Sequence, residues 1–127
     1  MLLDTDTISY YLRGDEQIKQ KLHKYHQQLS STVINYAELI YGLKKRDNKK
    51  YLPKVLLIFD NIKLYDFTKK SADIFASLKS KMSKVGIIVA DMDLMIASIA
   101  IANDEILITN NIKHFSKIDD LIIKSWV

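Results

Sequence analysis

Short apolar segments alternate with longer amphipathic segments along the whole chain, and this alternation constrains the fold more than any other feature. Brief apolar runs rich in β-branched residues indicate strands, whereas apolar residues recurring every three or four positions indicate helices. Repeated strand–helix units favour right-handed crossovers, which place successive strands parallel in one sheet. The sequence therefore predicts an α/β fold, a three-layer α/β/α sandwich with a central, mostly parallel sheet.

Glycine and polar residues mark where the segments begin and end. Gly14 ends the first helix, Asn35 is expected to cap the third, and Gly86 ends a long amphipathic helix. The predicted strands are residues 2–4, 29–34, 62–65, 105–109 and 121–126, with 87–90 forming either a strand or a buried loop. The predicted helices are residues 5–12, 15–27, 35–46, 48–59, 68–84 and 91–103, with a helical turn at 111–115. No linker or repeat divides the chain, so a single domain over residues 1–127 is expected.

Composition excludes several classes of protein. The chain has 127 residues, 48% of them hydrophobic, which is enough to bury a core without crosslinks or metals. Because there is no cysteine, disulfide scaffolds, thiolate zinc sites and a cysteine nucleophile are excluded. No leader is visible at the start, and the most apolar stretch, Leu94 to Ala102, is too short to span a bilayer. We therefore expect a soluble cytoplasmic protein with no membrane partner.

Acidic and amide side chains follow several predicted strands. Functional groups of open parallel sheets gather at the carboxyl ends of the strands, so these side chains are expected to converge on one edge. The residues in question are Asp4 and Asp6 after the first strand, Glu38 in the helix after the second, Asp91 and Asp93 opening the apolar helix, and Asn110 and Asn111 after the fourth. Clustered carboxylates repel one another unless protons or cations compensate. A hard dication such as Mg²⁺ or Mn²⁺ is the natural partner, and it could activate water for phosphoryl transfer.

Each of these acids also has a purely structural interpretation. Asp4 could cap the helix that follows it, and Asp91 suits the same use slightly better than a site role. Glu38 could complement the helix dipole or pair with Asn35 in a capping arrangement. Asp93 has fewer such explanations, because it directly precedes an apolar run that must be largely buried.

The basic residues are concentrated in one segment. The net charge is +4, which mildly favours a polyanionic partner. Six of the eleven residues from 44 to 54 are basic: Lys44, Lys45, Arg46, Lys49, Lys50 and Lys54. This segment could contact phosphates, or it could simply be a solvated face at a helix C-terminus.

Five blocks of the sequence, in order, resemble the PIN-domain ribonucleases, and VapC-type toxins of bacterial toxin–antitoxin pairs in particular. They are Leu2-Leu3-Asp4-Thr5-Asp6, Ala37-Glu38-Leu39-Ile40-Tyr41-Gly42, Asp93-Leu94-Met95-Ile96-Ala97, Thr109-Asn110-Asn111-Ile112-Lys113-His114-Phe115, and the terminal Trp126. The resemblance implies the PIN three-layer sandwich and Mg²⁺- or Mn²⁺-dependent endonucleolytic cleavage of RNA. It further implies a small VapB-like antitoxin that inserts a segment into the active-site groove, and a homodimer.

The resemblance also assigns roles to individual residues. Asp4 and Asp93 match metal-binding acids, and Glu38 matches an acid that binds metal or orients the attacking water. Asn111 stands where the family often has a fourth acid, and here it would be a supporting polar group. Asp6 and Asp91 are additional acids, either of which could compensate for the missing charge.

Two alternative functions remain open from the sequence. The block Asp4-Thr5-Asp6 also resembles the nucleophile motif of haloacid-dehalogenase-like phosphatases, which form an aspartyl-phosphate. The phosphatase interpretation gives no role to Glu38 or to the block that begins at Asp93. The second alternative is a non-catalytic PIN-like module that binds RNA or a partner protein.

Overall fold

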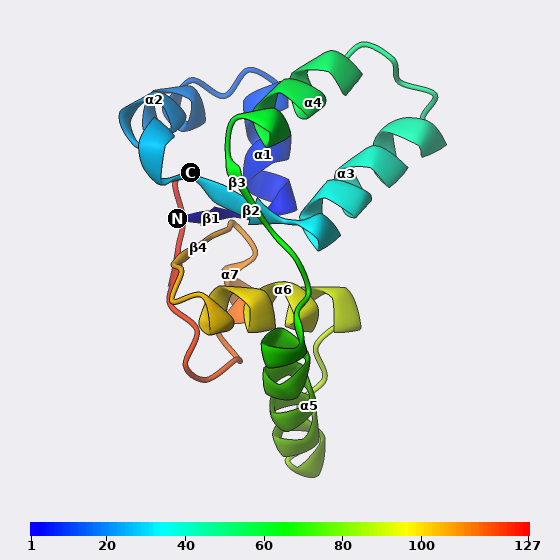
Figure 1. Ribbon diagram of the computed structural model, residues 1–127, viewed down its shortest axis with the longest axis vertical. Coiled ribbons are helices and arrows are strands. Elements are labelled where there is room, and N and C mark those ends of the chain that lie inside the picture. Colours follow the sequence, from blue (N-terminus) through cyan, green and yellow to red (C-terminus); the bar gives the residue numbers. More distant parts are fainter.

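The computed structural model describes all 127 residues and contains a five-stranded sheet in the order β3-β2-β1-β4-β5 (Figure 1). All four strand pairs are parallel, which confirms the predicted sheet. The strands are β1 (Leu2–Leu3), β2 (Ser30–Thr32), β3 (Lys63–Tyr65), β4 (Leu107–Ile108) and β5 (Ile123–Lys124). They are shorter than the apolar runs suggested, and residues 87–90 form no strand.

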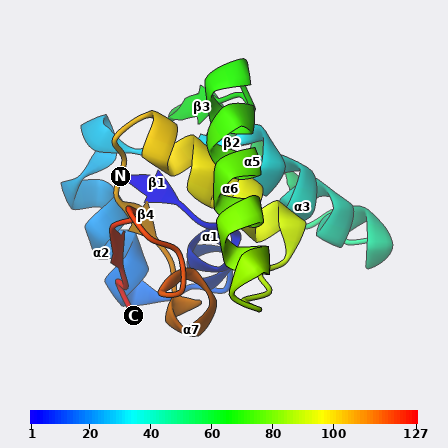
Figure 2. The same cartoon turned by 90° about the horizontal axis from the view of Figure 1, so that it is seen from below.

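Helices cover both faces of the sheet, which confirms the three-layer sandwich (Figures 1 and 2). The first group lies on one face and consists of α1 (Thr5–Leu12), α2 (Glu16–Lys24), the short 3₁₀-helix η1 (His26–Gln28), α3 (Val33–Lys45) and α4 (Leu52–Asp60). The second group lies on the other face and consists of α5 (Lys69–Lys84), α6 (Asp91–Ala102) and α7 (Ile112–Phe115). None of these helices is long and apolar enough to cross a membrane.

The two central strands supply side chains to a separate core on each face. Successive residues of a strand point to opposite faces. Leu2 and Leu107 pack in the core beneath α5 and α6, whereas Leu3 and Ile108 pack in the core beneath α1, α3 and α4. All four side chains are at most 1% exposed. Two-residue strands therefore suffice here, because every residue of β1 and β4 is part of one core or the other.

Helix α3 begins two residues earlier than predicted. Its N-cap is Thr32, whose Oγ1 accepts from the backbone N–H groups of Ile34 and Asn35, both at 3.1 Å. The expectation that Asn35 caps this helix is therefore wrong, and its side chain is fully buried instead. Because the helix starts at Val33, Glu38 lies beyond the first turn and does not complete a capping arrangement. Capping preferences could not separate Thr32 from Asn35, because both residue types cap well.

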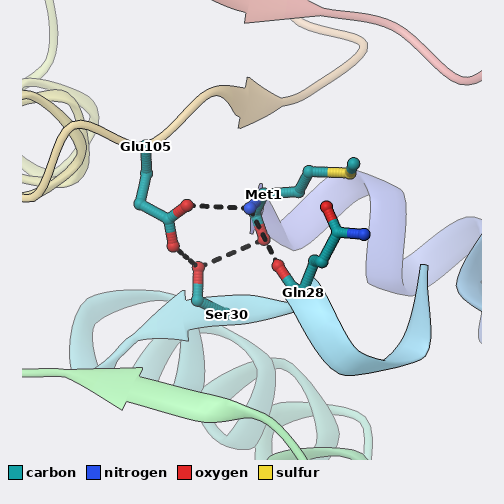
Figure 3. A network of polar contacts seen from close by, with 4 residues as sticks. All are labelled: Met1, Gln28, Ser30 and Glu105. Atoms are coloured by element: carbon teal, nitrogen blue, oxygen red, sulfur yellow. Dashed lines mark hydrogen bonds and ion pairs between the residues drawn. The ribbon is translucent and has the colours of Figure 1, made fainter.

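Polar contacts tie the first residue of the chain to β2 and to the segment before β4 (Figure 3). The Met1 amino group donates to Glu105 Oε1 at 2.8 Å and to the Gln28 carbonyl at 2.9 Å, while the Ser30 hydroxyl donates to Glu105 Oε2. Burial opposes ionisation of Glu105, but these hydrogen bonds outweigh it and hold its pKa below the ordinary value. The network fixes the edge of the sheet opposite to the carboxyl ends of the strands.

Candidate active site

A polar cavity of about 590 Å³ lies at the carboxyl ends of β1 and β4. The pairing of Leu3 with Ile108 brings the residues that follow these strands, Asp4 and Thr109, side by side. The cavity is lined by ten residues: Asp4, Thr5, Asp6, Ser9, Tyr10, Arg13, Glu38, Asp93, Asn110 and Asn111. Six of the seven candidate residues named from the sequence are among them, and Asp91 is the exception. We call this space the acidic cavity.

Asp4 is buried in the wall of the acidic cavity and is held by three neutral donors. Its Oδ1 accepts from the Thr5 backbone N–H at 2.9 Å and from Asn35 Nδ2 at 3.0 Å, and its Oδ2 accepts from Thr109 Oγ1 at 2.7 Å. The carboxylate thus caps α1, as the structural interpretation expected, and also faces the cavity. Burial raises the pKa of Asp4 to about 7, helped by the nearby charge of Asp6, although the Thr109 hydrogen bond opposes the rise.

Asn35 and Thr5 connect Asp4 to the second acid. Asn35 Nδ2 donates to Thr5 Oγ1 at 3.0 Å as well as to Asp4, and Thr5 Oγ1 donates to Glu38 Oε1 at 2.8 Å. This chain of contacts fixes the position of Glu38 on α3 relative to β1. Burial raises the pKa of Glu38, the Thr5 hydrogen bond opposes the rise, and repulsion from Asp93 adds to it.

Asp6 and Asp93 face the same cavity from α1 and α6. Asp6 Oδ2 accepts from the Asn110 backbone N–H at 3.0 Å, which joins α1 to the segment after β4. Asp93 is half-buried in the first turn of α6. Burial raises the pKa of Asp93, the electrostatic interaction with His114 opposes the rise, and repulsion from Asp6 adds to it. Mutual repulsion between these acids shows that they share one electrostatic environment.

Asp91 does not join these acids. Its Oδ1 forms an ion pair with Lys79 Nζ at 2.8 Å, and it lines a separate cavity between α5 and α6. It is not the N-cap either, because Ala90 holds that position without a side-chain hydrogen bond. Two residues along a helix rotate a side chain by about 200°, so Asp91 and Asp93 cannot face the same way.

The four acids of the cavity lack basic partners. The ion pairs of the protein are Met1–Glu105, Lys69–Asp73, Lys79–Asp91 and Lys81–Asp119. None of them involves Asp4, Asp6, Glu38 or Asp93. The cavity therefore holds negative charge that no lysine or arginine neutralises directly.

Comparison with known proteins assigns the family. Residues 1–121 match the PIN domain family model. The chain belongs to the PIN-domain family. It is 38% identical to Ribonuclease VapC2 of Rickettsia felis over 77% of this chain and 72% of that protein. It is 27% identical to Ribonuclease VapC2 of Haemophilus influenzae over 99% of this chain and 97% of that protein.

A solved structure agrees with this assignment. The fold matches that of a chain in the complex of VapBC2 from Rickettsia felis bound to a promoter DNA fragment, with a TM-score of 0.91 and 28% identity. The match covers 99% of this chain and 98% of the other. The predicted resemblance to VapC-type PIN-domain ribonucleases is thereby confirmed.

The donor set of this PIN domain suits a hard dication. All candidate ligands are oxygen atoms of carboxylates, amides and hydroxyls, which Mg²⁺ and Mn²⁺ prefer. As arranged, no three acidic or histidine side chains are close enough to hold one ion together. That spacing still fits Mg²⁺, which is commonly bound through one or two carboxylates together with water and substrate phosphates.

Three polar residues of the PIN domain site were missed or misread in the sequence. Thr5 and Asn35 link Asp4 to Glu38, and Thr109 holds the second oxygen of Asp4. Thr109 could have been found, because it follows β4 as Asp4 follows β1. Asn35 could not, because its amide reaches Asp4 only through the packing of α3 on β1.

Proposed function

We propose that this protein is a Mg²⁺- or Mn²⁺-dependent endoribonuclease that acts as the toxin of a toxin–antitoxin pair and cleaves RNA phosphodiesters with water. The observation that carries the proposal is the acidic cavity itself. It gathers four carboxylates without a basic partner at the carboxyl ends of parallel strands, in a chain of the PIN-domain family. Glu38 and Asp93 both face this cavity, which a phosphatase built on Asp4 and Asp6 would not require.

Each acid has a distinct part in the proposed reaction. Asp4 and Asp93 would hold the dication, and Glu38 would orient the attacking water, since no three of the acids are close enough to hold one ion together. A bound dication lowers the pKa of water and neutralises charge that develops on the phosphate. Asp6 and Asn111 support the site from the neighbouring wall of the cavity.

Neutral hydrogen bonds prepare Asp4 for this use. Thr109, Asn35 and the Thr5 backbone fix both carboxylate oxygens without adding positive charge. A lysine or arginine in their place would neutralise Asp4 and compete with a cation. The arrangement therefore keeps the carboxylate in one orientation while leaving its charge available.

The proposed partners follow from the same family membership. A VapB-like antitoxin is supported by the structural match to a chain of a VapBC complex. A homodimer is proposed from membership of the family alone. We propose the cytoplasm as the place where the protein acts on its RNA substrate.

The test is cleavage of RNA by the purified protein. Labelled total RNA would be incubated with Mg²⁺, with Mn²⁺ or with EDTA, and the products would be separated on a denaturing gel. Fragments should form only with a dication. Asp93→Asn should abolish them, whereas Asp91→Asn, on the same helix turn but paired with Lys79, should cut at the wild-type rate. RNA binding without metal-dependent cutting would instead support the non-catalytic alternative.

A further inference from the structure

A groove between α1 and α3 opens into the acidic cavity. It has a volume of about 400 Å³, and its lining includes Arg13, Glu38, Gly42, Arg46, Asn48 and Tyr51. We call it the α1–α3 groove. Building on the proposed ribonuclease function, we propose that it holds the RNA strand beside the cleavage site, and that Arg13 and Arg46 are its phosphate-positioning residues.

The groove and the acidic cavity form one continuous surface. Four residues line both of them: Thr5, Ser9, Arg13 and Glu38. A chain of phosphates that has one member beside the acids can therefore continue into the groove without leaving the protein surface. Glu38 marks the boundary, and Arg46 lies beyond it toward the C-terminal end of α3.

The basic side chains that line the α1–α3 groove are arginines, a residue type that is rare in this chain. Of the 19 basic residues only two are arginines, and both of them line the groove. Neither forms an ion pair, and the Arg13 guanidinium lies over the Tyr10 ring at 4.8 Å from its centre. Arginine binds phosphate through a planar fork of donors, which lysine cannot do. Both guanidinium groups are thus available to a phosphate backbone.

Gly42 gives independent support. It lies inside α3, where glycine is less favourable than alanine. A Cβ at this position would meet no atom within 4 Å, and the backbone does not adopt a positive φ. Neither helix geometry nor packing requires a glycine here. The missing side chain does keep the groove open between Glu38 and Arg46.

Charge distinguishes a nucleic acid from a protein segment as the occupant. Carboxylates of the acidic cavity accept a phosphate only through a dication, while Arg13 at the junction and Arg46 in the groove bind phosphates directly. An acidic peptide would match only the two arginines. A strand of RNA, with a phosphate at every nucleotide, matches both the arginines and the acidic cavity.

Binding would be measured by fluorescence anisotropy with a labelled single-stranded RNA of mixed sequence, in EDTA so that no cutting occurs. Arg46→Ala should weaken binding by about tenfold and reduce the slope of log affinity against log salt by about one. Arg13→Ala should act in the same direction. Arg46→Lys should keep the slope but recover only part of the affinity, because the charge stays and the fork is lost.

The matched control is Lys45→Ala, which removes an equal charge from the neighbouring, exposed residue outside the groove. It should change affinity by less than about twofold. Gly42→Gln should weaken RNA binding while raising the urea midpoint of unfolding, because glutamine favours the helix but fills the groove. If Gly42 had only a structural role, Gly42→Gln would lower both the RNA affinity and the urea midpoint of unfolding.

In cleavage assays with Mg²⁺, the loss in Arg46→Ala should fall on KM rather than on kcat. Equal losses in Arg46→Ala and Lys45→Ala would overturn the proposal, as would unchanged RNA affinity combined with lost binding of an acidic peptide. A wild-type protein that binds RNA through Arg13 and Arg46 but never cuts it would overturn the ribonuclease function while leaving the groove assignment intact.

Discussion

Replacing Asp4 by asparagine should stabilise the metal-free protein at alkaline pH. The pKa of Asp4 rises from an ordinary value of 3.8 to about 7 in the folded state. Because the folded state holds this proton more tightly, stability is fully present below the unfolded pKa and is lost as the pH rises through the folded pKa. The difference of about three pKa units corresponds to about 4 kcal/mol lost above the folded pKa. More than half of this loss falls between pH 5 and pH 8.

Asparagine fits the position with little rearrangement. Its Oδ1 can keep the contacts from the Thr5 N–H and Asn35 Nδ2, and its amide nitrogen can donate to Thr109 Oγ1. The Thr109 hydroxyl hydrogen can then turn toward Asp6, whose Oδ2 is 3.5 Å away. The substitution therefore removes the buried charge while each wild-type contact of the Asp4 carboxylate keeps one donor and one acceptor.

Urea unfolding at pH 5 and pH 8 in EDTA measures the effect. The wild type should lose stability across this range, and Asp4→Asn should lose markedly less. Adding Mg²⁺ at pH 8 should stabilise the wild type and leave the variant nearly unchanged, because the ion compensates a charge that the variant lacks. Equal pH profiles for the two proteins would refute the reasoning, since the buried charge of Asp4 would then cost nothing.

Three further substitutions test the surroundings of Asp4. Asn35→Ala should lower the free energy of unfolding by about 1–3 kcal/mol in urea titrations, because it removes the buried donor to Asp4 and Thr5; unchanged stability would contradict that contact. Thr109→Val should raise the pKa of Asp4 further, seen by NMR titration of its carboxyl carbon, because it removes the hydrogen bond that opposes the rise; a lowered pKa would contradict this. Glu38→Gln should slow RNA cleavage at least tenfold without loss of stability, and wild-type rates would exclude Glu38 from the reaction.

The layers of the fold follow from the sequence because they depend on local patterns. Leu2, Leu3, Leu107 and Ile108 are apolar, and such short apolar runs indicated strands, which the structure shows to be central and buried on both faces. Strand ends were less accurate, since the apolar run at residues 105–109 contains only two strand residues. A strand ends where its backbone hydrogen bonds to the neighbouring strands end, and hydrophobicity alone does not show that point.

The positions of the site's acids could be predicted from the sequence where an acid directly follows a strand. Asp4 directly follows a central strand, so its place at the edge of the sheet was fixed once β1 was identified. The sequence favoured Asp93 over Asp91 for the site, and helix rotation together with the Lys79 ion pair explains why only Asp93 faces the acidic cavity. Asn35 was misread as a cap because its contact with Asp4 depends on how α3 packs against the sheet.

Binding of Mn²⁺ tests most directly whether residues far apart in sequence together form one cation site. Electron paramagnetic resonance would follow free Mn²⁺ during titration into the wild type, Asp93→Asn and Asp91→Asn. We expect the wild type and Asp91→Asn to bind the ion with similar affinity and Asp93→Asn to bind it at least tenfold more weakly. Equal binding by all three proteins, or no binding by a folded wild type with RNA present, would contradict a dication site in the acidic cavity.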